Sequence, residues 1–237
     1  MLEIKNYSYE YFKNKEVIHN IDLKVKEGDI YAFLGRNGAG KSTTIKSIVG
    51  INNIKEGDIL LNKVSIKKEP LKYKMKISFV PDTPMLYENI KGIDYLNFIA
   101  DIYEVGTEDR EERIKKYATQ FEIYKALDDL ISSYSHGMKQ KLVIVASLIH
   151  DFDLYVLDEP FVGLDPEATY NLKQIIKDLS KEGKIIFFST HVLDVAESLC
   201  NKVAIIDNGK IIIDDDMDKV IKKKSLEDFF MDLLKDE

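Results

Sequence analysis

The sequence predicts an α/β fold in which buried parallel strands alternate with helices, within a single domain over residues 1–237. Almost continuously apolar tracts are typical of strands buried on both faces of a parallel sheet, and helical patterns lie between them. Hydrophobic residues make up 45% and charged residues 32% of the chain, which excludes a disordered or collagen-like protein. The tracts occur at 30–34, 77–80, 154–157 and 185–188.

The first third of the chain has the pattern of short strands. We expect strands over Leu2–Tyr9 and Val17–Val25, the second of which alternates apolar and polar residues. The segment Lys26–Gly28 has the composition of a turn and precedes the buried tract at 30–34.

Strand patterns stop between about residues 88 and 150. Apolar residues there recur at helical spacing, so we expect an inserted helical subdomain over approximately 88–150. Helices that belong to the core of the main domain are the alternative. The positions that carry the pattern are Ile90, Ile93, Leu96, Phe98, Ile99, Ile102 and Tyr103.

The C-terminal part predicts a β-hairpin followed by a helix. Strands over 202–206 and 210–213 flank Asp207-Asn208-Gly209, and an Asn-Gly pair favours the positive φ angles of a tight hairpin turn. Residues 214–237 are expected to cap the domain, with one helix over Met217–Leu234.

A glycine-rich loop follows the first buried tract and precedes a helical pattern. It matches the phosphate-binding loop G-x-x-x-x-G-K-[ST], whose curled backbone points N–H groups inward at a positive helix end. We expect Lys41 to reach the β- and γ-phosphates and Ser42 to bind Mg²⁺; a structural turn is the alternative. The predicted nucleotide-binding residues here are Gly35, Arg36, Asn37, Gly38, Ala39, Gly40, Lys41, Ser42 and Thr43.

Two adjacent carboxylates end the buried tract at 154–157. Side chains alternate along a strand, so Asp158 and Glu159 cannot point the same way, which suits different roles. Asp158 is expected to hold Mg²⁺ and Glu159 to activate the attacking water as general base; a solvated acidic turn is the alternative. A guanine-specific GTPase is excluded, since Asn62-Lys63 and Asn201-Lys202 both lack the Asp of Asn-Lys-x-Asp.

A third motif, Tyr134-Ser-His-Gly-Met-Lys-Gln-Lys-Leu142, lies between the phosphate loop and the acidic pair. Ser135 is a good helix N-cap and Gly137 permits close backbone approach, so this helix end can bind phosphate. The motif resembles the Leu-Ser-Gly-Gly-Gln signature of ATP-binding subunits of ATP-binding cassette (ABC) transporters. The resemblance covers essentially the whole chain. It implies a P-loop NTPase core with a parallel sheet, an N-terminal antiparallel β subdomain and an inserted α-helical subdomain.

The resemblance implies roles for further residues. Ser135 and Gly137 would bind the γ-phosphate of an ATP molecule held by a second subunit. Asp165 lies in a segment that resembles the D-loop, which crosses the dimer interface in the family. His191 resembles the switch histidine, which contacts the γ-phosphate and the water activated by Glu159.

One departure from the family pattern concerns the implied metal site. Asp82 stands where the family usually has glutamine, so the implied metal site consists of Ser42, Asp82 and Asp158. An aspartate can accept a hydrogen bond from metal-bound water but cannot donate, and it adds negative charge near the γ-phosphate. We therefore expect slower or more Mg²⁺-dependent hydrolysis than with glutamine at this position.

An aromatic residue that stacks on the adenine is expected early in the chain. Its spacing from Val17 favours Phe12, with Tyr11 and Tyr9 as rivals.

The implied cofactors are ATP and Mg²⁺, and the implied partners are a second ATP-binding subunit and a transmembrane permease. The longest apolar stretch, 142–149, is far shorter than the ~18 residues of a membrane-spanning helix, so transport requires that separate partner. Tyr87, Ile90 and Ile93 are candidate docking residues, with a role in the helical core as the alternative. A net charge of −7 argues against nucleic acid as a partner.

The N-terminus lacks a secretory signal pattern, so we expect the chain in the cytoplasm. The family resemblance implies a peripheral position on the cytoplasmic face of the cell membrane. Tyr134 and His136 resemble the signature of some bacterial exporters and weakly favour export. A non-transport ABC ATPase and a regulatory ATP-binding module are the alternatives. The coiled coil or second cassette expected of non-transport ABC proteins is absent from the sequence.

Overall fold

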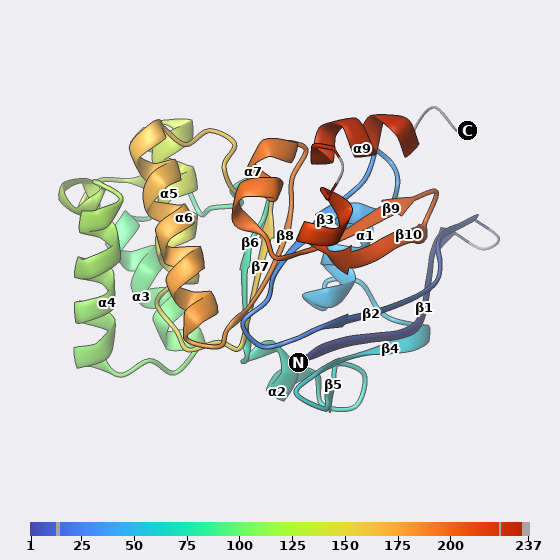
Figure 1. The fold of residues 1–237 in the computed structure, drawn as a ribbon. Helices are drawn as coiled ribbons and strands as arrows, with labels where there is room; N and C mark the ends of the chain where they lie inside the picture. Colours follow the sequence, from blue (N-terminus) through green and yellow to red (C-terminus); the bar gives the residue numbers. More distant parts are fainter. Residues whose placement is uncertain (13–14, 223, 234–237) are drawn as a thin grey trace.

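The computed structural model describes residues 1–12, 15–222 and 224–233, which form two β-sheets surrounded by helices (Figure 1). The larger sheet has the order β10-β9-β3-β8-β7-β6. All neighbouring strands in it pair in parallel except β10, which is antiparallel to β9. The predicted α/β fold with a parallel sheet is confirmed. The strands are β3 (Ile30–Leu34), β6 (Ile77–Val80), β7 (Leu154–Asp158), β8 (Ile185–Ser189), β9 (Lys202–Asp207) and β10 (Lys210–Asp216).

The smaller sheet is antiparallel and has the order β2-β1-β4-β5. Its strands are β1 (Leu2–Phe12), β2 (Lys15–Val25), β4 (Glu56–Leu61) and β5 (Val64–Ser65). The first two strands were predicted and are longer than expected, whereas β4 and β5 were missed. Gly57 interrupts the pattern of β4 because two backbones approach there: a Cβ on Gly57 would lie 2.4 Å from the carbonyl oxygen of Asn6.

Both faces of the large sheet are covered, which explains its apolar tracts. Tyr31 and Phe33 pack against the antiparallel sheet and α1 (Lys41–Ile48), whereas Ala32 and Leu34 pack with the helices on the opposite face. Because side chains alternate along a strand, a strand covered on both sides is apolar at every position.

Helices α3, α4 and α5 gather at the end of the molecule away from the antiparallel sheet (Figure 1). Their bounds are α3 (Gly92–Ile102), α4 (Thr107–Gln120) and α5 (His136–Ser147), with short 3₁₀ turns at Tyr124–Ala126 and Ile131–Ser133. Helix α2 (Pro70–Lys74) lies beside β5 of the antiparallel sheet (Figure 1). Two further helices are α6 (Pro166–Lys181) and α7 (Leu193–Leu199). The subdomain division over 88–150 stays a prediction. Within the described ranges, every helix is too short or too polar to cross a bilayer.

The hairpin between β9 and β10 has the predicted turn, with φ 43 at Asn208 and φ 74 at Gly209. The single helix predicted over Met217–Leu234 is wrong. Strand β10 runs on to Asp216, which pairs with Lys202 of β9, and two helices follow it. These are α8 (Met217–Val220) and α9 (Leu226–Leu233).

Local hydrogen bonding explains the interruption between the two C-terminal helices. The backbone N–H of Asp228 donates to Ser225 Oγ at 3.1 Å, and the Ser225 hydroxyl donates to the Asp228 carboxylate at 2.9 Å. A serine with these bonds starts a new helix rather than continuing an old one. Residues 234–237 lie outside the described part of the chain.

Candidate functional site

The phosphate-binding loop connects β3 to α1, as the sequence predicts. Gly38 and Gly40 have φ angles of 84 and 112, a left-handed conformation that favours glycine. Gly35 allows close approach of β9, because a Cβ there would lie 2.3 Å from the Ile206 carbonyl oxygen. The N–H of Gly209 donates to the Ala39 carbonyl at 3.0 Å, so the β9–β10 turn holds the loop in place.

A cavity of about 400 Å³ lies against this loop. It unites residues from the loop, from the ends of β6 and β7, and from the antiparallel sheet. The lining residues are Tyr11, Val17, Arg36, Asn37, Gly38, Gly40, Lys41, Ser42, Thr43, Asp82, Asp158 and Glu159. Most of the residues predicted from the phosphate loop and all three predicted metal ligands therefore meet in one pocket.

The Lys41 ammonium lies inside the curl of the loop. Its Nζ donates to the carbonyl oxygens of Gly35 at 2.6 Å and Arg36 at 3.1 Å. Burial lowers the pKa of Lys41, and the negative charges of Glu159 and Asp158 oppose that shift. The pocket therefore holds a cation next to two acids.

Asp158 ends β7 and is only 4% exposed. Its carboxylate accepts a hydrogen bond from the Ser189 hydroxyl of the neighbouring strand β8. Burial raises the pKa of Asp158, the Ser189 hydrogen bond opposes this, and the charges of Asp82 and Glu159 raise the pKa further. Ser189 was not predicted, although a hydroxyl that ends an apolar strand beside the acidic strand is a usable signal.

The chain turns sharply after Asp158, since Glu159 has φ 49. The two carboxylates therefore leave the strand end in different directions. Glu159 Oε2 accepts hydrogen bonds from His191 Nδ1 at 2.9 Å and from the His191 backbone N–H at 3.3 Å. The structure brings these two predicted catalytic residues into direct contact.

The donor set of the pocket fits Mg²⁺. This ion prefers oxygen ligands and is usually held by one or two carboxylates together with substrate phosphates. The Asp158 carboxylate, the Asp82 carboxylate and the Ser42 hydroxyl line the same cavity beside the phosphate loop. Two protein acids and a hydroxyl leave the remaining positions to phosphate and water.

Among the residues whose side chains the structure describes, Tyr11 is the aromatic one that lines the pocket. Its hydroxyl lies 2.9 Å from Thr43 Oγ1, and its ring packs edge-on against Tyr9 with centroids 5.1 Å apart. The side chain of Phe12 lies outside the described residues, so its predicted stacking on adenine stays a prediction. Val17 also lines the cavity and was not predicted.

Ser135, Gly137 and Asp165 are absent from the lining of this pocket. Ser135 caps α5, since its side chain accepts from the N–H of Met138 at 3.2 Å. Asp165 caps α6 by accepting from the N–H of Ala168 at 2.8 Å. These three predicted residues therefore lie apart from the phosphate loop of their own chain.

The signature helix and the D-loop segment touch each other. Lys141 of α5 forms a 2.6 Å ion pair with Asp165, and a Cβ on Gly163 would lie 3.0 Å from Nε2 of His136. The hydrogen bonds from Ala168 and Lys141 lower the pKa of Asp165. Lys141 was not predicted, because its partner lies in a distant segment.

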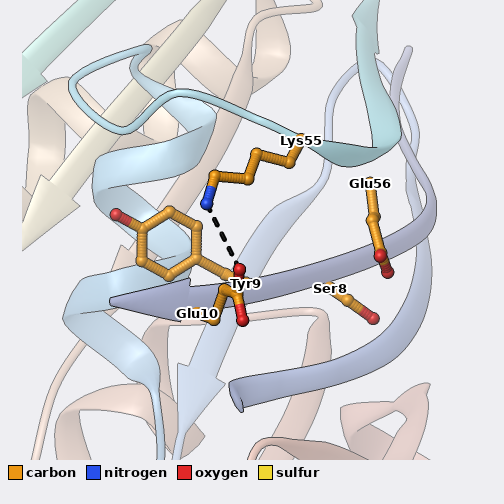
Figure 2. A pocket seen from close by; sticks show the side chains of 5 residues that line it. All are labelled: Ser8, Tyr9, Glu10, Lys55 and Glu56. Atoms are coloured by element: carbon orange, nitrogen blue, oxygen red, sulfur yellow. Dashed lines mark hydrogen bonds and ion pairs between the residues drawn. The ribbon is translucent and has the colours of Figure 1, made fainter. Parts of the chain in front are cut away.

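A smaller cavity of about 120 Å³ lies on the antiparallel sheet, between Ser8, Tyr9, Glu10, Lys55 and Glu56 (Figure 2). Lys55 Nζ points across it and pairs with Glu10 Oε1 at 3.2 Å. This smaller cavity contains neither the phosphate loop nor the acidic pair. The cavity of about 400 Å³ contains both and is therefore the candidate site.

Comparison with known proteins agrees with this geometry. A family model described as ABC transporter matches residues 18–162. The chain is 31% identical to ABC-type transporter ATP-binding protein EcsA of Bacillus subtilis (strain 168), over 100% of this chain and 98% of that protein. It is 30% identical to the SkfA peptide export ATP-binding protein SkfE of the same organism, over 90% of this chain and 88% of that protein.

A solved structure, described as the ATP-binding subunit of an ABC transporter, has the same fold. It matches with a TM-score of 0.94 and 31% identity, over 99% of both chains. The chain therefore belongs to the ABC transporter family, among its ATP-binding proteins.

Proposed function

We propose that this chain hydrolyses ATP in the presence of Mg²⁺ and thereby powers transport through a separate transmembrane permease. The observation that carries the proposal is the single pocket that combines the phosphate loop, the buried acid Asp158 and the acid Glu159, with His191 bound to Glu159. A module that only retained ATP would need the loop but not a general base oriented by a histidine.

The residues divide the chemistry among them. The loop N–H groups and Lys41 bind the phosphates, and Asp158 and Ser42 hold Mg²⁺, which supplies charge neutralisation at the phosphates. Glu159 accepts the proton of the attacking water, and His191 holds the carboxylate in place. Among the described residues nothing hydrogen-bonds Oε1 of Glu159, so in this proposal that oxygen accepts from the water.

ATP joins two copies of the chain or two related subunits. Ser135 and Gly137 lie at the N-terminus of α5 and outside the pocket of their own chain. An N-terminal helix end binds anions, so this end completes the ATP site of a second subunit. The bound nucleotide then stabilises the closed dimer, and loss of the γ-phosphate reopens it.

The permease docks on an apolar cavity beside α3. This cavity, of about 720 Å³, is lined by Leu86, Tyr87, Glu88, Asn89, Ile90 and Phe98. Tyr87 is 64% exposed and packs edge-on against Phe98. Of the expected docking residues, Tyr87 and Ile90 line the cavity, whereas Ile93 is absent from its lining and packs against the core.

Backbone hydrogen bonds tie this docking segment to the segment that precedes the signature. The N–H of Ile131 donates to the Ile90 carbonyl at 2.9 Å, and the N–H of Ser132 donates to the Glu88 carbonyl at 2.9 Å. The Glu88 side chain also pairs with Lys139 of α5. A displacement of the docking segment by the permease would therefore reach the helix that binds the second ATP.

Export across the cell membrane is the proposed direction, with the chain on the cytoplasmic face. It is supported by the similarity to SkfE, whose name assigns that relative to peptide export, and by the exporter-like residues Tyr134 and His136 of the signature.

Two measurements test this function. The purified chain should release phosphate from ATP with Mg²⁺ and lose this activity with a chelator, and Glu159→Gln should bind ATP without hydrolysing it. A membrane protein encoded beside the gene should co-purify with the wild type.

Matched tyrosine variants test the docking cavity. Tyr87→Glu should abolish co-purification with the permease, whereas Tyr170→Glu, at a tyrosine of α6 that is 63% exposed, should retain it.

Hydrolysis by Glu159→Gln at the wild-type rate would refute the proposed base, and equal co-purification of both tyrosine variants would refute the docking cavity.

A further inference from the structure

The surface around α2 differs in charge from the rest of the chain. The segment Lys63–Lys76 holds six lysines and one glutamate, a net charge of +5, whereas the whole chain carries −7 and the remainder therefore −12. All six lysines are exposed. In the part of the chain that the structure describes, Lys72 alone of the six has an acidic partner, Glu69 at 3.2 Å.

Large apolar side chains stand beside these lysines. Leu71 is 80% exposed and Ile51 is 62% exposed. Helix α2 is anchored by Tyr73, which is fully buried and donates to the Ile48 carbonyl at 2.9 Å. Leu71 therefore points into solvent from a fixed helix and not from an unattached loop.

A cavity of about 390 Å³ lies between α2 and the segment that follows α1, and two of the six lysines, Lys67 and Lys74, line it. It is lined by Gly50, Asn52, Asn53, Ile54, Ile66, Lys67, Pro70 and Lys74. The Lys74 side chain lies against Gly50, since a Cβ on Gly50 would be 2.6 Å from Lys74 Cε. Lys67 is held at the rim by hydrogen bonds to the carbonyl oxygens of Lys55 at 3.1 Å and Gly57 at 3.2 Å.

We propose that this α2 basic surface, made of Ile51, Lys67, Lys68, Leu71, Lys72 and Lys74, binds the anionic headgroups of a phospholipid bilayer. Lysines attract a negatively charged membrane surface, and exposed apolar side chains insert at the boundary between headgroups and acyl chains. The inference goes beyond the proposed transport function and does not depend on a permease, since this surface shares no residue with the docking cavity or the nucleotide pocket.

The chemistry of the surface favours lipid over an acidic protein or nucleic acid. Residues 46–76 contain no arginine, the residue whose planar fork pairs specifically with carboxylates and phosphodiesters. Lysines are point charges that suit a diffuse layer of anionic headgroups. A nucleic-acid backbone offers no apolar layer into which the exposed Leu71 and Ile51 side chains could insert, whereas a bilayer surface does.

Vesicle sedimentation with the purified full-length chain tests this inference. Binding is measured to phosphatidylcholine vesicles and to vesicles that also contain phosphatidylglycerol, at low and high salt. The test variant is Lys68→Glu/Lys72→Glu/Lys74→Glu, and Leu71→Ser tests the apolar part separately. The matched control, Lys115→Glu/Lys125→Glu/Lys177→Glu, changes the net charge equally at exposed lysines outside the surface.

We expect salt-sensitive binding of the wild type to the anionic vesicles only. The triple variant on the surface should lose affinity roughly a hundredfold, and Leu71→Ser on the order of tenfold. The control variant should bind like the wild type, and all variants should still bind ATP. Equal loss in the test and control triple variants, binding to neutral vesicles, or binding through the same lysines to a polyglutamate peptide but not to vesicles would overturn the proposal.

Discussion

His191 Nδ1 lies 2.9 Å from Oε2 of Glu159, at the adjacent ends of two parallel strands. The ring N–H donates to the carboxylate, and the backbone N–H of the same histidine donates to the same oxygen. The orientation of the proposed general base is thus fixed by the strand that follows it in the chain.

Removal of the histidine should therefore slow the chemical step. We expect His191→Ala to lower kcat roughly 10²- to 10³-fold, within the range of a general acid–base contribution, with little change in ATP affinity. His191→Asn, which keeps an N–H donor near Glu159, should retain more activity than His191→Ala. A steady-state ATPase assay with a separate nucleotide-binding assay distinguishes the two effects, and a wild-type kcat for His191→Ala would contradict this role.

Asp82→Gln should extend activity to lower pH and lower Mg²⁺ concentration. In the proposed mechanism Asp158 must be ionised to hold Mg²⁺, and the negative charge of Asp82 contributes to raising the pKa of Asp158. Without that charge the pKa of Asp158 falls, so the acidic limb of the pH–rate profile moves to lower pH. The comparison is made by titrating Mg²⁺ and pH for both proteins; identical Mg²⁺ requirements and rates would refute the effect of Asp82.

Asp165→Ala should destabilise the fold. The substitution removes the cap of α6 and leaves the largely buried Lys141 without its acidic partner. Loss of an N-cap costs about 1 kcal/mol, and the isolated lysine adds to that loss. Asp165→Asn keeps a capping oxygen and should cost less than Asp165→Ala. Urea unfolding measures both, and equal stabilities of all three proteins would show that the cap and ion pair contribute nothing.

His150 should make the fold acid-sensitive. It is 4% exposed, stacks on Tyr103 with centroids 3.5 Å apart, and has a pKa that burial lowers to about 4 from its ordinary 6.5. Because the unfolded chain binds the proton more tightly, stability is retained above pH 6.5. It is lost as the pH falls toward 4, by up to roughly 3 kcal/mol.

The histidine-specific part of this acid sensitivity can be isolated by substitution. His150→Phe should flatten the dependence of unfolding free energy on pH, whereas substitution of the exposed His136 by Phe should not. An unchanged slope for His150→Phe would place the acid sensitivity elsewhere.

Apolar tracts in the sequence predicted the bounds of strands that are covered on both faces. Strands β3 and β6 begin and end where the apolar tracts at 30–34 and 77–80 do, because each is covered on both faces. The Asn208-Gly209 turn was equally predictable, since its φ angles depend on two residues only.

Features set by distant contacts escaped prediction. Strand β4 contains a glycine required by the backbone of β1, so its pattern does not indicate a strand. The break before α9 depends on Ser225 capping a new helix. In the site, the motifs indicated Glu159 and His191 separately, but Ser189 and Lys141 act through partners in other segments.

In the proposed mechanism two chains share each ATP, and Ser135 of one chain completes the pocket of the other. Sedimentation of Glu159→Gln with ATP and Mg²⁺ tests it most directly. We predict a stable dimer with ATP, a monomer without nucleotide, and loss of the dimer when Ser135→Arg is added to the variant. A Glu159→Gln protein that binds ATP with Mg²⁺ yet stays monomeric would contradict the shared site for this chain.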